Sequence, residues 1–440
     1  MMKKILLKMM NPFFDQYTLD FFTKEYSSNP FVMLTAAEKM GLKNIVEAQM
    51  RAETGKVLSL PYGSNIKFSP WDKLLLNPRQ LFNLPTKYVS QINTETIIGK
   101  NCKKPLKLSM PIMVTGMSYG GSLSFNMKVA VAKGTKMAGT STNTGESTII
   151  KEVKENCKYV VGQYNRACLM KEEDLPLLDA IEVQLGQGAW GGAVESTTYA
   201  YEIDEKLRKD WRMNENEDKM FKARMKGIES QEDLKKLIEK LKNKYDVPIG
   251  IKIAATDFIE KELDVITSTK CDFIVIDGVE GGTAVAPPTL EDNLGLPTLY
   301  ALIRTVKYLE QKNIKDKFDL IITGGLTSPG HFLKALALGA DAVYIGSIAV
   351  FAAVHNQAVK TLPEEPPTQL ALNTGKNKGD LDIDLAAKSL CNFLMSCNEE
   401  MKLALQATGK KKYSELSKSD VVSLDKEISD YTGINYVLRS

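Results

Sequence analysis

The sequence predicts an α/β protein, a (β/α)8 TIM barrel with N-terminal and C-terminal helical extensions. Three observations predict this fold: eight short apolar runs lie between residues 110 and 349, each run ends in small or polar residues, and helical patterns separate several of them. The runs are almost continuously hydrophobic, which is typical of parallel strands covered on both faces. A doubly wound sheet is the alternative, but eight strands alternating with helices favour a closed barrel.

The eight predicted strands follow one another along the chain. Each ends in Gly, Ser, Thr, Asn or Gln, and barrel enzymes place their chemistry in the loops that leave these ends. In order, the segments that contain them are MPIMVTGMSYGG, AGTSTNTGE, KYVVGQYN, AIEVQLGQG, IGIKIAAT, FIVIDGVEGG, LIITGGLT and AVYIGSIA.

Amphipathic helices are predicted between and after the strands. Residues 233–244 and 298–312 each carry apolar residues at i, i+3, i+4 and i+7. The helices after the second and third strands give the weakest patterns. Residues 382–410 predict one long helix that stops at Gly409, and residues 29–53 also show helical periodicity.

These patterns divide the chain into three parts. Residues 1–105 are predicted to be an extension that packs on the barrel, because no repeated strand pattern occurs there. The barrel is predicted for residues 106–365, and residues 366–440 form a helical extension. A charged insertion at about 192–228 follows the fourth strand and is expected to cover the top face as a lid.

Composition narrows the class of protein. The 440 residues include 57 Lys and Arg against 54 Asp and Glu, a net charge of +3, which gives no indication of nucleic acid or of an acidic membrane surface. The six cysteines form no CxxC pair, which suggests reduced thiols in a cytoplasmic protein. Two histidines make zinc chemistry and a histidine base unlikely.

One stretch, residues 335–354, is long enough to span a membrane. It contains Gly339, Asp341 and Gly346, however, and its periodicity changes along its length. We therefore predict the end of a helix, a strand and the start of the next helix, and no membrane association.

Two pairs of small residues end the last two strands. Gly324-Gly325 follows the seventh strand and Gly346-Ser347 follows the eighth. Phosphate groups are commonly bound at these positions of a barrel, where backbone N–H groups and helix N-termini can approach the anion. Ordinary tight turns are the alternative, but two consecutive ones favour a phosphate site.

A buried lysine suggests which phosphate compound is bound. Lys252 lies in the apolar run of the fifth strand, where an unpaired charge is costly and an anionic neighbour is expected. A salt bridge at the strand end would also explain it. FMN accounts for both features, since its phosphate would lie on the glycine pairs and Lys252 near N1 and O2 of the ring.

The chain resembles the FMN-binding domain of glutamate synthase, and most closely the stand-alone FMN-binding glutamate synthase family. The resemblance covers about residues 105–365 and, more weakly, both extensions. It rests on a combination of segments, namely PIMVTGMSYGGSLS, AGTSTNTGE, IEVQLGQGA, IGIKIA, EGGTAVAPP, GLPTL, TGGLTSPGHFLKALALGADAVYIGSIA and SDVVSLD.

The resemblance implies roles for individual residues. Gly116, Ser118 and Thr144 would lie at the cofactor, Gln163 would hydrogen-bond the flavin pyrimidine, and Lys252 would act at the N1–O2 edge. Gly324, Gly325, Gly346 and Ser347 would hold the phosphate. Glu146 would face the substrate side of the ring as a catalytic residue, although a carboxylate near a helix N-terminus is an equally weighted interpretation.

The chain also departs from the family pattern. Phe351, Gln357 and Leu362 stand where three cysteines hold an iron–sulfur cluster in glutamate synthase, so no cluster is expected and no metal site is predicted. Gln184 and Trp190 replace two lysines that help to bind a dicarboxylic keto acid. Together with Gln187 they are the predicted substrate residues, and 2-oxoglutarate is not carried over as the substrate.

The function implied is an FMN-dependent oxidoreductase of amino-acid metabolism, acting on CH–NH2 donors or the corresponding imines, as in glutamate biosynthesis. It would depend on a small-molecule substrate and on a protein that supplies electrons or ammonia, since the glutaminase domain is not recognised; a homo-oligomer is possible. Two alternatives stay open. One is a hydroxy-acid oxidase, which would need a better placed base than His331 or His355; the other is a non-catalytic flavin-binding subunit of a larger complex.

Overall fold

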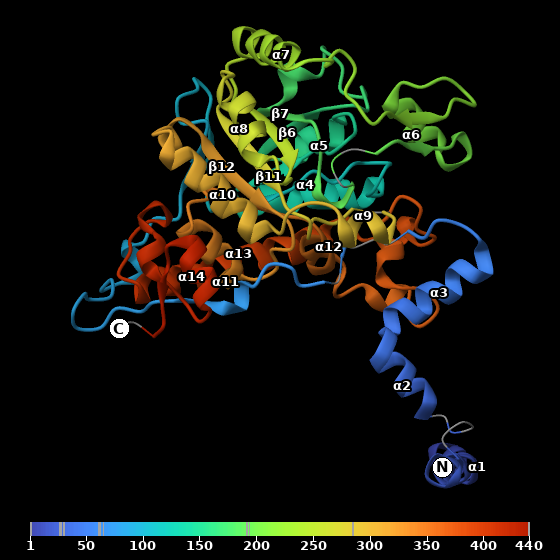
Figure 1. The fold of residues 1–440 in the computed structure, drawn as a ribbon. Helices are drawn as coiled ribbons and strands as arrows, with labels where there is room; N and C mark the ends of the chain where they lie inside the picture. Colours follow the sequence, from blue (N-terminus) through green and yellow to red (C-terminus); the bar gives the residue numbers. More distant parts are fainter. Residues whose placement is uncertain are drawn as a thin grey trace. The chain divides into compact units, whose positions relative to one another are not determined.

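The computed structural model describes residues 2–25, 29, 31–59, 63–64, 66–190, 192, 194–283 and 286–438. The chain forms two compact units, Met1–Ser59 and Leu60–Ser440. The first unit contains the helices α1 (Met2–Thr23), α2 (Phe31–Met40) and α3 (Leu42–Thr54). The second contains all of the predicted strands and a long C-terminal helix (Figure 1).

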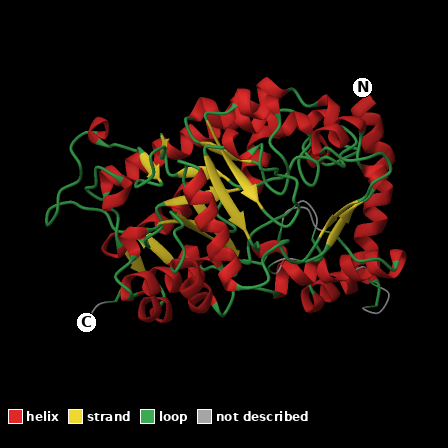
Figure 2. Ribbon diagram, turned by 90° about the horizontal axis from the view of Figure 1, so that it is seen from above, coloured by secondary structure: helices red, strands yellow, loops and turns green. Residues whose placement is uncertain are grey.

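A ring of eight parallel strands forms the centre of the second unit (Figure 2). Each pairs in parallel with its neighbours in the order β4-β13-β12-β11-β10-β7-β6-β5, and a parallel bridge between Gly116 and Asn143 closes the ring. This closure confirms the predicted barrel and excludes a doubly wound sheet. The strands are β4 (Ile112–Val114), β5 (Ser141–Asn143), β6 (Tyr159–Tyr164), β7 (Ala180–Gln184), β10 (Ile249–Ala254), β11 (Phe273–Asp277), β12 (Asp319–Thr323) and β13 (Ala342–Ile345).

Helices cover the outside of the ring. The two predicted from their periodicity form as α7 (Gln231–Lys244) and α10 (Thr298–Gln311), and only a short 3-10 turn at Leu175–Leu177 follows β6. The stretch 335–354 contains a helix end, a strand and a helix start, as predicted. The other covering helices are α4 (Phe125–Ala138), α5 (Lys151–Asn156), α8 (Ile259–Thr267), α9 (Pro288–Asn293), α11 (Pro329–Ala337) and α12 (Ser347–Val354).

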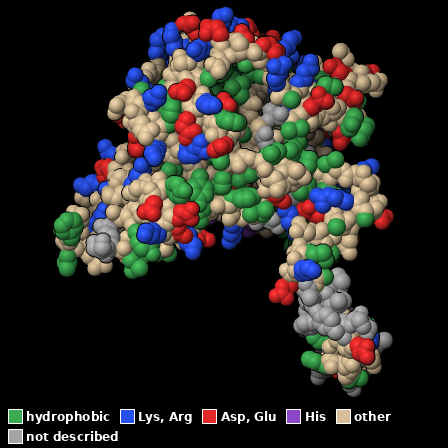
Figure 3. Space-filling model, viewed as in Figure 1, with side chains coloured by type: hydrophobic (Ala, Val, Ile, Leu, Met, Phe, Trp, Pro, Cys, Tyr) green, Lys and Arg blue, Asp and Glu red, His purple; other side chains and the backbone are tan. Residues whose placement is uncertain are grey.

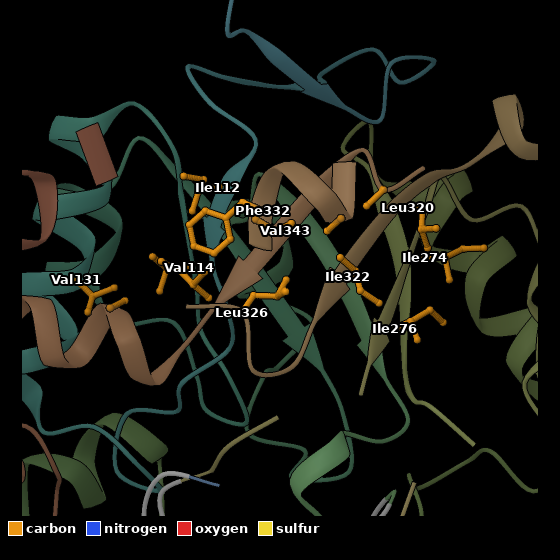
Figure 4. Close-up of a cluster of buried hydrophobic side chains, with 14 of the residues drawn as sticks. Ile112, Val114, Val131, Ile274, Ile276, Leu320, Ile322, Leu326, Phe332 and Val343 are labelled. Carbon is orange, nitrogen blue, oxygen red and sulfur yellow. The ribbon is translucent and has the colours of Figure 1, made fainter. Parts of the chain in front are cut away.

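Side chains alternate between the two faces of each barrel strand, which explains the continuous apolar runs. Ile274 and Ile276 of β11 belong to the core between the strands and the helices, where Phe332 of α11 and Val131 of α4 also lie (Figure 4). Phe273 and Val275, which alternate with them along β11, belong to a second cluster inside the barrel. Both faces are therefore buried, as expected for a parallel sheet.

A hairpin that the sequence did not indicate packs against the interior cluster. It consists of β2 (Thr96–Ile98) and β3 (Leu106–Leu108), and its Ile98, Leu106 and Leu108 side chains are fully buried. The N–H of Gly99 donates to the carboxylate of Asp319, the first residue of β12, at 2.6 Å. The hairpin thus lies at the amino end of the strands, which leaves the opposite end available for a site.

The insertion after β7 is fastened to the loops that follow the first two barrel strands. It contains β8 (Ser196–Thr198), α6 (Glu205–Trp211) and β9 (Lys219–Phe221). The indole N–H of buried Trp211 donates to the Ser147 hydroxyl at 3.0 Å, and the Tyr119 hydroxyl donates to Asp210 at 3.1 Å. These bonds hold α6 against both loops.

The C-terminal segment adds one long helix, α13 (Ile383–Ala407), which begins at the Asp382 cap and is followed by Gly409 with φ of 73°. A Cβ at Gly134 of α4 would lie 2.8 Å from the Ala387 carbonyl, so α4 and α13 pack backbone to backbone. The remaining elements are β1 (Leu74–Leu76), β14 (Val421–Ser423), α14 (Lys426–Thr432) and β15 (Asn435–Tyr436).

Acidic and basic side chains are interspersed on the face drawn in Figure 3, which agrees with the small net charge of +3. Within the described ranges, none of the helices combines the length and the apolar character needed to cross a membrane.

Candidate functional site

A cavity of about 530 Å³ opens at the carboxyl ends of the barrel strands. Its walls come from the loops after the strands, from residues 64–72 and from the insertion. All predicted site residues except Thr144 and Gln184 line it, namely Gly116, Ser118, Glu146, Gln163, Gln187, Trp190, Lys252, Gly324, Gly325, Gly346 and Ser347.

The two small-residue pairs border this cavity, and a helix follows each. Gly324 and Gly325 have φ of 120° and 65°, which favour glycine. The Ser328 hydroxyl caps α11 by accepting from the His331 N–H at 3.3 Å, and α12 starts at Ser347. Each turn therefore brings backbone groups and the start of a helix to the cavity wall, a combination that suits an anion.

Packing also requires the first glycine pair. A Cβ at Gly324 would lie 2.4 Å from the Thr298 hydroxyl oxygen, and a Cβ at Gly325 would lie 2.6 Å from Cβ of Glu280. Glu280 itself accepts from the Thr298 N–H at 2.8 Å and from the Thr298 hydroxyl at 2.6 Å. The glycines are thus needed for the close approach of the loops after β11 and β12.

Lys252 forms the floor of the cavity and is buried. Its ammonium lies 2.9 Å from the Asp277 carboxylate on the neighbouring strand β11. Burial disfavours the charged form, but Asp277, with Glu182 and Glu146 further away, raises the pKa of Lys252 above its ordinary value. The anionic neighbour expected from the sequence is therefore a side chain of this protein, and the lysine stays charged.

A polar network surrounds this pair inside the barrel. The Gln163 amide donates to Glu182 at 2.7 Å, and the Asn143 amide donates to the same carboxylate oxygen at 3.4 Å. A Cβ at Gly116 would lie only 2.5 Å from the Gln163 amide nitrogen, so the first loop lies directly on this network. Because the Glu182 carboxylate accepts from the NH2 group of Gln163, it fixes the orientation of the Gln163 amide.

Glu146 lines the cavity from the loop after β5 and forms an ion pair with Arg166. The two side chains are 2.9 Å apart, and Arg166 is 7% exposed. The guanidinium also donates to the backbone carbonyls of Val194 and Lys222, on either side of the β8–β9 hairpin. Arg166 therefore connects Glu146 to the insertion. No helix begins directly at Glu146, because α5 starts at Lys151.

Thr144 and Gln184 lie behind the wall of the cavity. The Thr144 hydroxyl accepts from the Gln163 N–H at 3.0 Å, and the Gln184 amide donates to Gln187 at 3.1 Å. Gln184 is 4% exposed and Thr144 is 1% exposed. Each therefore positions a residue that lines the cavity, and neither Thr144 nor Gln184 lines the cavity itself.

Four polar atoms at the cavity wall are buried and have no partner among the described residues, which indicates a polar ligand or water. They are Thr115 Oγ1, Asp277 Oδ1, Glu280 Oε1 and His331 Nδ1. His331 lies in the first turn of α11 and stacks with Trp71, and burial, together with Lys334, lowers its pKa. His355 is exposed and does not line the cavity.

Three charged side chains in or behind the cavity wall, Asp277, Glu182 and Lys128, were not singled out from the sequence. Asp277 and Glu182 are acidic residues inside apolar strands, the same pattern that identified Lys252. Lys128 is a fully buried lysine of α4 that donates to the carbonyls of Met117, Asn143 and Thr144 behind the cavity wall. Burial lowers the pKa of Lys128 to about 7.

The positions aligned with cluster ligands lie around α12. Phe351 belongs to α12, and Gln357 exchanges hydrogen bonds with the backbone of Asp382 at 2.8 and 3.0 Å. Across the described part of the chain, no three His, Cys, Asp or Glu side chains gather as a metal site would require. The predicted absence of an iron–sulfur cluster stays a prediction.

Comparisons of the sequence identify relatives. Residues 67–411 match the family described as a conserved region in glutamate synthase. The archaeal-type glutamate synthase [NADPH] of Dehalococcoides mccartyi is 33% identical over 331 residues, which cover 69% of this chain and 64% of that protein. The glutamate synthase large subunit-like protein of Rhizobium meliloti is 28% identical over 421 residues, covering 91% and 94% of the two chains.

Solved structures with the same fold include the recombinant flavin-binding domain of baker's yeast flavocytochrome b2, with a TM-score of 0.51 at 15% identity over 86% of this chain and 83% of that one. An active chimera of (S)-mandelate dehydrogenase gives a TM-score of 0.51 at 13% identity, over 85% of this chain and 94% of that one. At this level of identity the likeness supports the barrel fold alone.

Proposed function

The chain belongs to the glutamate synthase family, and we propose that it is an FMN-dependent oxidoreductase acting on an imine or amino-acid-type substrate. One observation carries the proposal: the turns at Gly324-Gly325 and Gly346-Ser347, each followed by a helix, and the buried Lys252 all line one cavity. An FMN site needs both features, an anion-binding turn for the phosphate and a cation near the ring.

The residues present fit FMN. Gly324, Gly325, Gly346 and Ser347 would hold the phosphate through backbone N–H groups and the Ser347 hydroxyl, while Gly116 and Ser118 would lie against the ring. Gln163 and Lys252 would meet its pyrimidine edge. The unpartnered polar atoms of the cavity wall support a polar ligand at this place, and a volume of about 530 Å³ lies within the range typical of cofactor sites.

FMN, when bound, supplies hydride transfer at N5. Reduction of an imine adds the hydride to carbon and a proton to nitrogen, and oxidation of an amine removes both. The protein's part is to orient the ring, to place Lys252 where negative charge develops on it, and to hold the substrate under the insertion. Glu146 would accept an N–H of the substrate, with Arg166 holding the carboxylate in position.

The reductant and the ammonia source belong to the proposal as partners. The names of several relatives give NADPH as the reductant of those enzymes. For this chain we propose a cytoplasmic reaction of amino-acid metabolism that depends on an electron-donating or ammonia-supplying protein.

A second candidate is a flavin-binding subunit that does not itself turn over. It is favoured by the fact that Lys252 and Glu146 both already have partners within the chain. Steady-state turnover with ammonia and a panel of keto acids distinguishes the two candidates, since only the enzyme would oxidise reduced flavin in a substrate-dependent manner.

The absorption spectrum of the purified protein tests the proposal. Two flavin bands are expected, with FMN released on denaturation. Lys252→Ala should weaken flavin retention or its photoreduction, whereas Lys270→Ala, at an exposed lysine paired with Glu239, should change neither. A colourless protein that takes up no FMN on reconstitution would remove the redox function altogether.

A further inference from the structure

The cavity carries more negative than positive side chains. The charged residues among its described lining are Asp72, Glu146, Asp277 and Glu280 against Lys67 and Lys252. A ligand with two carboxylates would therefore enter a site in which acidic groups already predominate. The distribution of the two lysines decides whether such a ligand could find a cation.

The two lysines differ in what surrounds them. Lys252 is not free for a substrate, because it lies 2.9 Å from Asp277 and Glu182 adds a second negative charge close to it. Lys67 is exposed and lies four residues before Trp71, which stacks on His331 in the first turn of α11. Because α11 follows the Gly324-Gly325 turn, we assign Lys67 to the phosphate part of the proposed site and not to the wall of the insertion.

The part of the wall next to the insertion is lined by polar uncharged and aromatic side chains, with Glu146 beside them. Ser196 lies opposite Phe221 in the β8–β9 hairpin, and both line the cavity together with Gln187 and Trp190. Glu146 is the charged side chain of the described lining that lies beside this wall, since Arg166 holds it next to the backbone of Val194 and Lys222. Arg166 is buried, its Nε and Nη1 groups are engaged with Glu146 and the two carbonyls, and it is not part of the lining.

We propose that the substrate space under the insertion selects a compound with an amino group and no more than one carboxylate, rather than a dicarboxylate. The amino group would donate to Glu146, and the hydroxyl and amide groups of the wall would meet the remaining polar atoms. A second carboxylate would face Glu146, whose partner Arg166 is buried and does not line the cavity, and like charges in contact oppose binding strongly. This inference rests on the proposed flavin site.

Matched five-carbon probes test it with the FMN-loaded protein. Glutarate carries two carboxylates, and 5-aminopentanoate replaces one of them with an ammonium group. Titration of each, followed by the change in the flavin absorption spectrum, gives a dissociation constant without turnover. We expect 5-aminopentanoate to bind at least about tenfold more tightly than glutarate.

Two variants separate the charge of Glu146 from other effects. E146Q keeps an oxygen for Arg166 and should reduce the preference to less than about threefold, while S196K should improve glutarate binding by about tenfold. S196Q adds similar bulk without charge, so glutarate should bind S196K at least about tenfold more tightly than it binds S196Q. Glutarate binding as tightly as 5-aminopentanoate, or neither probe perturbing the flavin, overturns this inference and leaves the flavin proposal intact; a protein without flavin overturns both.

Discussion

Replacing Gly324 with alanine tests the turn at the end of β12 most directly. Gly324 has φ of 120°, a conformation that costs an alanine about 1–3 kcal/mol. The added Cβ would lie 2.4 Å from the Thr298 hydroxyl oxygen. That hydroxyl lies 2.6 Å from a Glu280 carboxylate oxygen and 2.9 Å from the Gly324 carbonyl oxygen, and its single proton is shared between these two acceptors, so moving it disturbs the contact between the two loops.

The expected cost combines these effects. Overpacking of a closely packed site costs about 1–3 kcal/mol in addition to the backbone strain, so G324A should lower the free energy of unfolding by about 2–6 kcal/mol. Urea unfolding, followed by tryptophan fluorescence, measures this loss. The protein should be freed of flavin first, because a ligand that binds the folded state adds its own stabilisation.

Gly330 provides the control, since it lies in the first turn of α11 only six residues further along the chain. A Cβ there would meet no atom closer than the Ser328 hydroxyl oxygen at 3.9 Å, and alanine is the better helix former by about 1 kcal/mol. G330A should therefore be as stable as the parent protein or slightly more stable. If G324A loses less than about 1 kcal/mol relative to G330A, the argument from the turn geometry is wrong.

Three further predictions concern buried charges. Burial raises the pKa of Asp319 to about 6, so its stabilising contribution is present at acidic pH and is lost as the pH rises through 6; D319N should flatten the dependence of Tm on pH between about 4 and 7. Burial lowers the pKa of Lys128 to about 7, so stability should rise between pH 7 and about 10, and K128M should abolish that rise in the same measurement. Arg166→Met leaves Glu146 unpaired and should lower the free energy of unfolding in urea by about 3–5 kcal/mol, with faster proteolysis within residues 192–228. Arg166→Lys should lower it by less. Equal proteolysis of Arg166→Met and the parent protein would contradict the role of Arg166 in connecting Glu146 to the insertion.

Local patterns predicted the barrel because each strand is buried on both faces and ends at a small residue. The same reasoning identified the two small-residue turns, which line one cavity; that they bind a phosphate stays a prediction. It could not show the β2–β3 hairpin, whose three-residue strands lie within TIIGKNCKKPLKL, a segment rich in lysine that gives no strand pattern. The burial of Ile98 and Leu106 depends on the barrel interior above them and on no local property of the chain.

The sequence also could not predict which charged side chains on different strands and loops would pair. Lys252 and Asp277 are neighbours because β10 and β11 pair in register, so that Ala254 lies opposite Asp277. The sequence indicated that Lys252 needs an anion but not which one. Arg166 gave no indication of its role, because its partners Glu146, Val194 and Lys222 come together only when the insertion folds back over the loops after β5 and β6.

Backbone groups form the part of the cavity wall at the glycine turns, whereas side chains form the part that the insertion contributes. This difference decides how the protein could change its specificity. The glycine turns and the N-termini of α11 and α12 act through the backbone, whose N–H groups stay in place when side chains change. The insertion wall acts through side chains held by Arg166, while Trp211 and Tyr119 fasten α6 to the loops after β4 and β5. Substitutions in the β8–β9 hairpin can therefore alter the charge that meets a substrate while the glycine turns that would bind a phosphate keep their geometry.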